Sequence, residues 1–159
     1  MAYKQIPRPV CYNPDTVNRL SSSRRAIPER HLISKPLSTM KPRILFVDDN
    51  EDCRVITSEL LRSHGYEPTT AATREEGLTR ARGGSYDLYL LDYLFRDGTG
   101  RELCEKIREF DPDTPILFFS ASLPSLQREA LACGAQGFVL KPDFQGLRNE
   151  IRQALDTAA

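Results

Sequence analysis

Segments with the pattern of β-strands alternate with segments that have the period of α-helices, from residue 43 to the end of the chain. Three stretches, 44–47, 88–91 and 138–140, are apolar throughout, which is typical of strands buried on both faces of a sheet. With two further stretches, the expected strands are 43–47, 66–71, 87–91, 115–119 and 136–140.

The segments between and after these strands space their apolar residues at helical intervals, which predicts helices over 51–64, 73–82, 99–110, 124–133 and 143–157. In the segment 99–110, Thr99 and Glu102 form a capping box at the start. Its residues Leu103, Ile107 and Phe110 are expected on one stripe of that helix. Five strands alternating with five helices predict a doubly wound α/β domain around a parallel sheet.

The formal net charge of zero hides a split between the two parts of the chain. Residues 1–43 hold nine Lys or Arg and two acids, a net of +7, whereas residues 44–159 hold 13 and 20, a net of −7. The first 40 residues also contain five prolines and no lasting apolar period, so we predict a disordered basic extension over residues 1–40. A solvated tail is the favoured interpretation. Contact with nucleic acid or an acidic partner, a transit peptide, and a true start at Met40 stay open.

Membrane insertion and secretion are not expected. No run approaches the roughly 18 apolar residues of a membrane span, and residues 1–10 lack the apolar segment of a secretory signal. The four cysteines, Cys11, Cys53, Cys104 and Cys133, have no spacing suited to zinc, and we expect reduced thiols. We therefore expect a cytoplasmic protein without a membrane partner, whose single folded domain stands alone.

Charged residues directly follow the three apolar runs: Asp48 and Asp49 the first, Asp92 the second and Lys141 the third. The carboxyl ends of parallel strands meet at one edge of a sheet, where ligands bind. Three carboxylates and one ammonium at that edge predict a pocket that binds a cation and handles phosphate. Ser120, after the fourth expected strand, could donate a hydrogen bond to a phosphoryl oxygen there.

Carboxylates brought together at this edge need a counter-ion, because two unit charges about 4 Å apart repel by roughly 4 kcal/mol at an effective dielectric of 20. Mg²⁺ suits such a site, since it binds through one or two carboxylates and keeps several waters. A carboxylate beside the ion can attack phosphorus, which makes Asp92 the expected acceptor. For Asp48 and Asp49 alone a second interpretation stays open, namely two acids that favour the dipole at the start of the first helix.

Together these motifs resemble the receiver domain of two-component response regulators, of the stand-alone type, over residues 42–157. The resemblance lies in four stretches taken in order: the acidic pair in ILFVDDNEDC, the aspartate in LYLLDYLFRDGTG, the hydroxyl in ILFFSAS and the lysine in GAQGFVLKP. Each motif alone has low specificity. The spacings are specific as a set: 43 residues from Asp49 to Asp92, 28 more to Ser120 and 21 more to Lys141.

The resemblance implies a flavodoxin-like sheet with strand order 2-1-3-4-5 and five helices. It also implies that Mg²⁺ is held by Asp49, Asp92 and the backbone carbonyl of Leu94, with Asp48 assisting through a water on the ion. Asp92 would take a phosphoryl group from the phosphohistidine of a sensor histidine kinase or a histidine phosphotransfer protein. Lys141 would contact that group.

A conformational switch is implied as well. Ser120 would move toward the phosphoryl group and Phe138 would turn inward. The face made by the fourth helix, fifth strand and fifth helix would then change its preference for a downstream protein target. Phe138 keeps a second interpretation as a core strand residue.

The chain departs from the family pattern in three ways. Arg96 stands where the family often has proline, and Ser120 replaces the commoner threonine. Leu94 and Ser122 occupy the positions, two after the acceptor and two after the hydroxyl, that influence the dephosphorylation rate in such proteins. These departures leave the lifetime of the phosphorylated state open.

A phosphatase of the haloacid dehalogenase type is the alternative function, since it also uses an aspartyl nucleophile and Mg²⁺. That family needs a second acid two residues after the nucleophile, whereas Asn50 follows Asp48 and Leu94 follows Asp92 at that distance. We therefore expect a phospho-accepting regulator and not an enzyme. A nucleotide-binding protein is disfavoured because neither a P-loop nor GxGxxG follows the first strand, and direct DNA binding is not expected of an acidic body.

Overall fold

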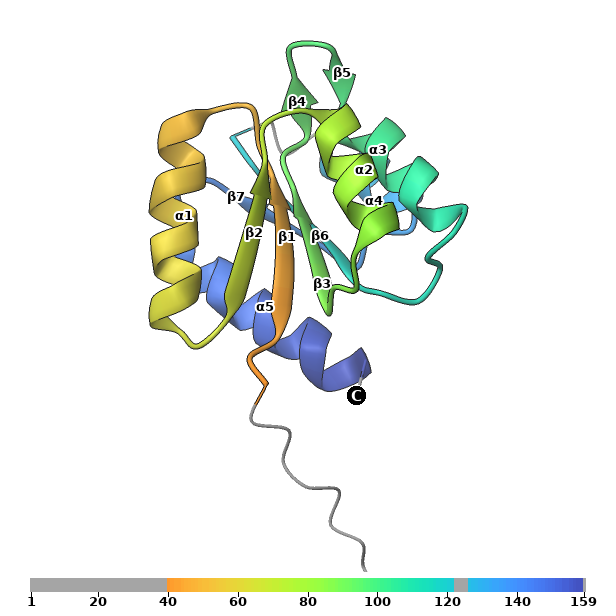
Figure 1. Cartoon of the computed structure of the whole chain (residues 1–159). Coiled ribbons are helices and arrows are strands. Elements are labelled where there is room, and N and C mark those ends of the chain that lie inside the picture. The colour runs from red at the N-terminus through yellow and green to blue at the C-terminus, as the bar shows by residue number, and fades with distance from the viewer. Residues whose placement is uncertain (1–39, 122–125, 159) are drawn as a thin grey trace, which may run out of the picture. The chain divides into compact units, whose positions relative to one another are not determined.

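The strands form one parallel sheet and one small hairpin. In the computed structural model, which describes residues 40–121 and 126–158, the sheet consists of β1 Arg43–Val47, β2 Glu67–Ala71, β3 Leu88–Leu91, β6 Ile116–Ser120 and β7 Gly137–Leu140. Their order is β2-β1-β3-β6-β7 (Figure 1). The expected order is confirmed, because β6 and β7 are the fourth and fifth strands of this sheet. The predicted extension over residues 1–40 lies outside the described residues, except for Met40.

Helices cover both faces of the sheet. They are α1 Glu51–Ser63, α2 Arg74–Gly83, α3 Gly100–Arg108, α4 Gln127–Ala132 and α5 Phe144–Ala158. The helices α1 and α5 pack on one face, and α2, α3 and α4 pack on the other (Figure 1). Among these described helices, none is both long and apolar enough to cross a lipid bilayer.

The central strands supply both hydrophobic cores. In β1, Ile44 and Phe46 join the core beneath α1 and α5, whereas Leu45 and Val47 join the core beneath the other three helices. Successive side chains of a strand point to opposite faces, so a strand covered on both sides must be apolar at every position. This requirement explains the continuous apolar runs that the sequence shows at β1 and β3.

The third helix ends earlier than expected. Leu103 and Ile107 lie in the helix and are buried, but Phe110 lies beyond the helix and is 39% exposed. The expectation for Phe110 is wrong because the backbone N–H groups of Phe110 and Asp111 both donate to the carbonyl of Ile107, which closes the helix in a turn. For the fourth helix, residues 124 and 125 of the expected range lie outside the described residues.

A two-stranded hairpin that the sequence did not predict follows β3. Its strands are β4 Leu94–Phe95 and β5 Gly98–Thr99, which pair antiparallel. Arg96 and Asp97 form the turn between them. Strands of two residues are too short to show a hydrophobic period, and only the Asp97-Gly98 turn signal marks this segment in the sequence.

The hairpin leads directly into α3. Thr99 is its last residue and also the N-cap of the helix, where its side chain accepts the backbone N–H of Glu102 at 3.4 Å. The carboxylate of Glu102 bonds Arg74 of α2. Of the predicted capping box, the bond from the Glu102 N–H to the Thr99 side chain is therefore present. The Glu102 side chain instead joins α3 to Arg74 of α2.

Candidate functional site

The charged residues that follow the strands come together at the carboxyl edge of the sheet. Asp48 and Asp92 follow the neighbouring strands β1 and β3, and the backbone N–H of Asp92 donates to the carbonyl of Val47 at 2.8 Å. Lys141 follows β7, and its N–H donates to the carbonyl of Ser120, the last residue of β6, at 3.0 Å. Because these strands are parallel, their ends bring the predicted site residues to one edge.

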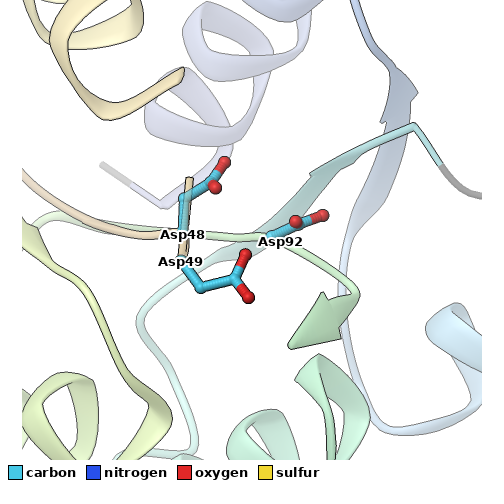
Figure 2. A group of neighbouring side chains, drawn as sticks. All are labelled: Asp48, Asp49 and Asp92. Carbon is cyan, nitrogen blue, oxygen red and sulfur yellow. The ribbon is translucent and has the colours of Figure 1, made fainter. Parts of the chain in front are cut away.

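Three carboxylates form a compact group at this edge. One oxygen from each of Asp48, Asp49 and Asp92 lies within 4.8 Å of the other two. Figure 2 shows the three groups extending from adjoining strand ends into the same region. Opposite ligands of an octahedral Mg²⁺ lie about 4 Å apart. The type and spread of these oxygens therefore fit a small, hard divalent cation.

Lys141 supplies a cation to this group. Its Nζ lies 2.5 Å from Oδ2 of Asp48 and 3.5 Å from Oδ2 of Asp92. Burial would lower the pKa of Lys141, but the hydrogen bond to Asp48 and the negative charges of Asp92 and Asp48 outweigh burial and raise it above its usual value. The ammonium therefore stays charged between the two carboxylates.

Asp48 is completely buried and has donors on both oxygens. Oδ1 accepts the backbone N–H of Asn50 at 2.8 Å, and Oδ2 accepts Lys141. Burial, helped by the charge of Asp92, raises the pKa of Asp48, whereas Lys141 and the Asn50 N–H work against this rise. Burial thus disfavours the charged form of Asp48, whereas the short contact with the Lys141 ammonium favours it.

Asp92 has one oxygen fixed by the backbone. Its Oδ1 accepts the N–H of Tyr93 at 2.8 Å, and its side chain is 12% exposed. Gly100, at the start of α3, packs against the same segment, and a Cβ built there would lie 2.1 Å from the Asp92 carbonyl oxygen. The close approach of α3 therefore requires glycine at position 100 and fixes the backbone that carries Asp92.

Arg96 contacts the third carboxylate, which the sequence did not indicate. Its backbone N–H donates to Oδ2 of Asp49 at 3.2 Å, and its Nε lies 3.7 Å from the same oxygen. The Arg96 side chain is 92% exposed, so this ion pair is screened by water. In the sequence Arg96 stands out only as a departure from proline. The Asp97-Gly98 signal was the available cue for a turn that brings Arg96 back to the site.

The two predicted switch residues lie on the neighbouring strands. Ser120 is buried at the end of β6 and pairs in register with Leu140. Phe138 is half-buried in β7, and its ring centroid lies 6.3 Å from that of Phe118 and 6.4 Å from that of Tyr93. Phe138 thus belongs to an aromatic cluster with Phe118 and with Tyr93, the residue that follows Asp92. This position is compatible with a switch residue and with a core strand residue.

The carbonyl predicted as a metal ligand belongs to the hairpin. Leu94 lies in β4, where it pairs with Thr99 of β5, and the residue is 52% exposed. A group of oxygen donors, a carboxylate that solvent can reach and a fixed ammonium are the parts that phosphoryl transfer to a carboxylate requires. The pocket brings together the three carboxylates, one of which is the partly exposed Asp92, and the ammonium of Lys141.

Comparisons with known proteins point to one family. The family model for the response regulator receiver domain matches residues 44–152. A response regulator receiver domain protein (CheY-like) from Methanospirillum hungatei JF-1 is similar in structure, with a TM-score of 0.71 at 30% identity over 75% of this chain and 97% of that chain. The response regulator protein TrrA from Thermotoga maritima, solved in complex with Mg(2+)-BeF, gives a TM-score of 0.67 at 32% identity over 72% and 99%.

Curated relatives share this segment within longer proteins. The uncharacterized transcriptional regulatory protein YkoG of Bacillus subtilis is 34% identical over 118 residues, which are 72% of this chain and 51% of YkoG. The transcriptional regulatory protein ZraR of Klebsiella oxytoca is 34% identical over 114 residues, which are 70% of this chain and 26% of ZraR. The chain therefore spans about half of the length of these relatives or less.

Proposed function

This chain belongs to the response regulator receiver domain family, and from that premise we propose that Asp92 accepts a phosphoryl group in an Mg²⁺-dependent reaction and so switches a protein-binding face. The observation that carries the proposal is the position of Lys141, whose Nζ lies 2.5 Å from Asp48 and 3.5 Å from Asp92. An ammonium held between the two acids that follow β1 and β3 is placed to contact the oxygens of a group attached to Asp92.

The donor is the phosphohistidine of a sensor histidine kinase or of a histidine phosphotransfer protein. A carboxylate oxygen of Asp92 forms a bond to phosphorus as the P–N bond breaks, and the electron pair of that bond stays with the imidazole. The product is an acyl phosphate on Asp92. Lys141 balances the negative charge on the transferring oxygens. The 12% exposure of the Asp92 side chain supports direct access by the donor.

Asp49, Asp92 and the backbone carbonyl of Leu94 would hold the Mg²⁺, with Asp48 assisting from the buried side. Bound there, the ion supplies positive charge to the phosphoryl oxygens. Support comes from the close spacing of the three carboxylates and from their hard oxygen donors, which Mg²⁺ prefers. The similar protein TrrA was solved in complex with Mg(2+)-BeF.

The conformational switch then follows phosphorylation. Ser120 moves toward the phosphoryl group, and Phe138 turns inward against the aromatic cluster that contains Tyr93. These movements change the face formed by α4, β7 and α5. Leu131 of α4 and Leu140 of β7 are 38% and 41% exposed, and they offer apolar contacts to a downstream protein target.

In this proposal the chain acts as a cytoplasmic signalling protein, and neither as an enzyme nor as a DNA-binding protein. Residues 44–159 hold 13 basic and 20 acidic residues, and this net charge of −7 opposes contact with a phosphate backbone. A phosphatase of the haloacid dehalogenase type would need an acid where Leu94 follows Asp92.

Labelling by acetyl phosphate tests the proposal. Wild type should gain one phosphoryl group in intact-mass spectrometry when Mg²⁺ is present and none in EDTA. Asp92→Asn should gain none. Asp156→Asn removes an exposed carboxylate on α5 and should be labelled like wild type. Equal labelling of wild type and Asp92→Asn would overturn the assignment, and sustained turnover of a phosphomonoester would favour the phosphatase.

A further inference from the structure

The hairpin that carries Leu94 depends on contacts from outside its own two strands. β4 and β5 pair with each other and not with the main sheet. An isolated two-stranded hairpin is marginal in water. On its inner side, Phe95 is 8% exposed in the core, and the N–H of Arg96 donates to Asp49 at 3.2 Å. Its outer side needs a separate support.

Arg74, the first residue of α2, provides this support. Its Nε lies 3.2 Å from Oδ1 of Asp97, and its guanidinium also bonds the carbonyl of Asp97 and the carboxylate of Glu102. The Arg74 side chain is only 20% exposed. Its guanidinium lies against Gly98, where a Cβ would come within 2.5 Å of Cζ. Arg74 therefore holds the turn of the hairpin and, through Glu102, the start of α3.

The backbone of Arg74 is itself fixed near the same sheet edge. α2 follows β2, whose last residue Ala71 accepts the N–H of Asp48 at 3.1 Å. The side chain of Thr73 caps α2 by accepting the N–H of Glu76 at 3.1 Å. The Glu76 carboxylate in turn accepts the N–H of the residue before the cap at 2.8 Å. Arg74 thus reaches the hairpin from a well-anchored helix start.

We propose that Arg74 is a positioning residue for the metal site, because it fixes the Leu94 carbonyl relative to the three carboxylates. This role rests on the proposed function, in which Leu94 is a ligand of Mg²⁺. Asp48, Asp49 and Asp92 follow strands of the main sheet, whereas Leu94 lies on the separate hairpin. A planar guanidinium bonded to two segments fixes orientation in a way that a single ammonium does not.

If Arg74 had a purely structural role, its loss would lower the stability of the whole protein. Ion pairs whose acidic partners are as exposed as Asp97 and Glu102, at 57% and 54%, contribute little to stability. The consequence of losing Arg74 is therefore a looser hairpin in a folded protein. Mg²⁺ affinity measures this looseness directly, and it does not depend on phosphorylation.

The test is Mg²⁺ titration of the full chain by calorimetry, at a temperature where each variant is folded. Arg74→Met removes the hydrogen-bonding fork and keeps an aliphatic stem. We expect about 3- to 10-fold weaker binding, less than the roughly 10- to 100-fold lost with a direct outer-shell partner. Hydrogen exchange of the Arg96 N–H should also become faster. Arg62→Met, which breaks the exposed 2.6 Å ion pair with Glu59 on α1, should bind Mg²⁺ like wild type.

Two further variants keep the test decisive if Arg74→Met does not fold. Asp97→Asn and Glu102→Gln remove the acidic partners with little change in shape, and both should weaken Mg²⁺ binding. Unchanged affinity in the folded variants, with normal binding and labelling by wild type, would overturn the role of Arg74 alone. A wild type that binds no Mg²⁺ would overturn the proposed function, and the role of Arg74 with it.

Discussion

One ammonium allows three carboxylates to share this pocket. Lys141 lies 2.5 Å from the fully buried Asp48, and no second cation approaches that carboxylate as closely within the described residues. Its removal would leave Asp48 buried beside two other acids. The cost of an uncompensated buried charge exceeds the net gain from a typical ion pair. Lys141 is therefore needed for the fold as well as for the proposed chemistry.

We predict that Lys141→Met lowers the free energy of unfolding by about 3 kcal/mol in EDTA at neutral pH, because it leaves Asp48 without its partner. Urea denaturation measures this change. Lys106→Met removes an exposed lysine of α3 and should change stability by less than about 0.5 kcal/mol. Adding Asp48→Asn to Lys141→Met should restore much of the loss. A lysine variant as stable as wild type would contradict the buried-pair interpretation.

Gly100 carries a second prediction at this scale. Gly100→Ala should destabilise the protein by about 2–3 kcal/mol, since its Cβ would overlap the Asp92 carbonyl and force the backbone apart. Acetyl phosphate labelling should slow in the same variant. Gly83→Ala is the matched control, because a Cβ at the last residue of α2 meets no atom within 4 Å. Equal stability of the two variants would show that α3 can move away from Asp92.

At the scale of elements, the sequence predicts the strands that are buried on both faces of the sheet. The strands β1 and β3 are apolar at every position because helices cover both faces, and a simple rule about strand ends then places Asp48 and Asp92 together. The same rule brings Lys141 to Asp48 across 93 residues of sequence. The positions of these residues could thus be derived without a structure, although their distances could not.

The hairpin and its support could not be derived in this way. Its strands are too short for a hydrophobic period, and the contact between Arg74 and Asp97 joins two polar residues 23 positions apart in the sequence. The spacing of charged residues along the sequence does not indicate which of them pair in the folded protein. The same lack of a signal explains Phe110, since an apolar residue one turn past Ile107 looks identical whether the helix continues or ends.

A side-chain hydrogen bond joins β3 to the loop after α3. The Tyr89 hydroxyl donates to Oδ2 of Asp111 at 2.8 Å, and the N–H of Thr114 donates to Oδ1 at 3.0 Å. Burial works against these bonds, but together they lower the pKa of Asp111. A carboxyl group with a lower pKa in the folded chain stabilises the protein above its unfolded pKa of about 4. This stability is lost as the pH falls through the folded pKa.

We predict that Tyr89→Phe lowers the free energy of unfolding by about 1 kcal/mol at pH 7. With one donor removed, the pKa of Asp111 lies closer to its unfolded value, so the variant loses less stability on acidification. The curves of wild type and variant should converge at acidic pH in urea denaturation. Tyr86→Phe removes a hydroxyl from a half-buried neighbour and should run parallel to wild type. A difference in unfolding free energy between wild type and Tyr89→Phe that stays constant with pH would contradict the link between the Tyr89 hydroxyl and the pKa of Asp111.

For the molecule as a whole, the site concentrates negative charge in an already acidic domain. Residues 44–159 hold 13 basic and 20 acidic residues, and three of the acids meet at one edge of the sheet. Like charges held together destabilise a fold, whereas a ligand that binds only the folded state stabilises it. Stability and Mg²⁺ binding should therefore respond in opposite directions when an acid of this group that is not part of a buried ion pair is removed.

Asp49 offers the sharpest test, since it is the most accessible of the three carboxylates, with a side chain 25% exposed. In EDTA, Asp49→Asn should raise the free energy of unfolding by about 1 kcal/mol through reduced repulsion. With Mg²⁺ at about 100 times its dissociation constant, wild type should gain roughly 2.7 kcal/mol by mass action. The variant should gain much less, so the order of the two stabilities reverses.

Urea denaturation in EDTA and in Mg²⁺ measures this reversal, with Asp52→Asn as the control for an exposed acid in the first turn of α1. That variant should gain as much from Mg²⁺ as wild type does. A change in packing alone would shift the stability of Asp49→Asn equally in both conditions. Equal stabilisation of wild type and Asp49→Asn by Mg²⁺ would therefore exclude Asp49 as a ligand, even if Asp92 were still labelled.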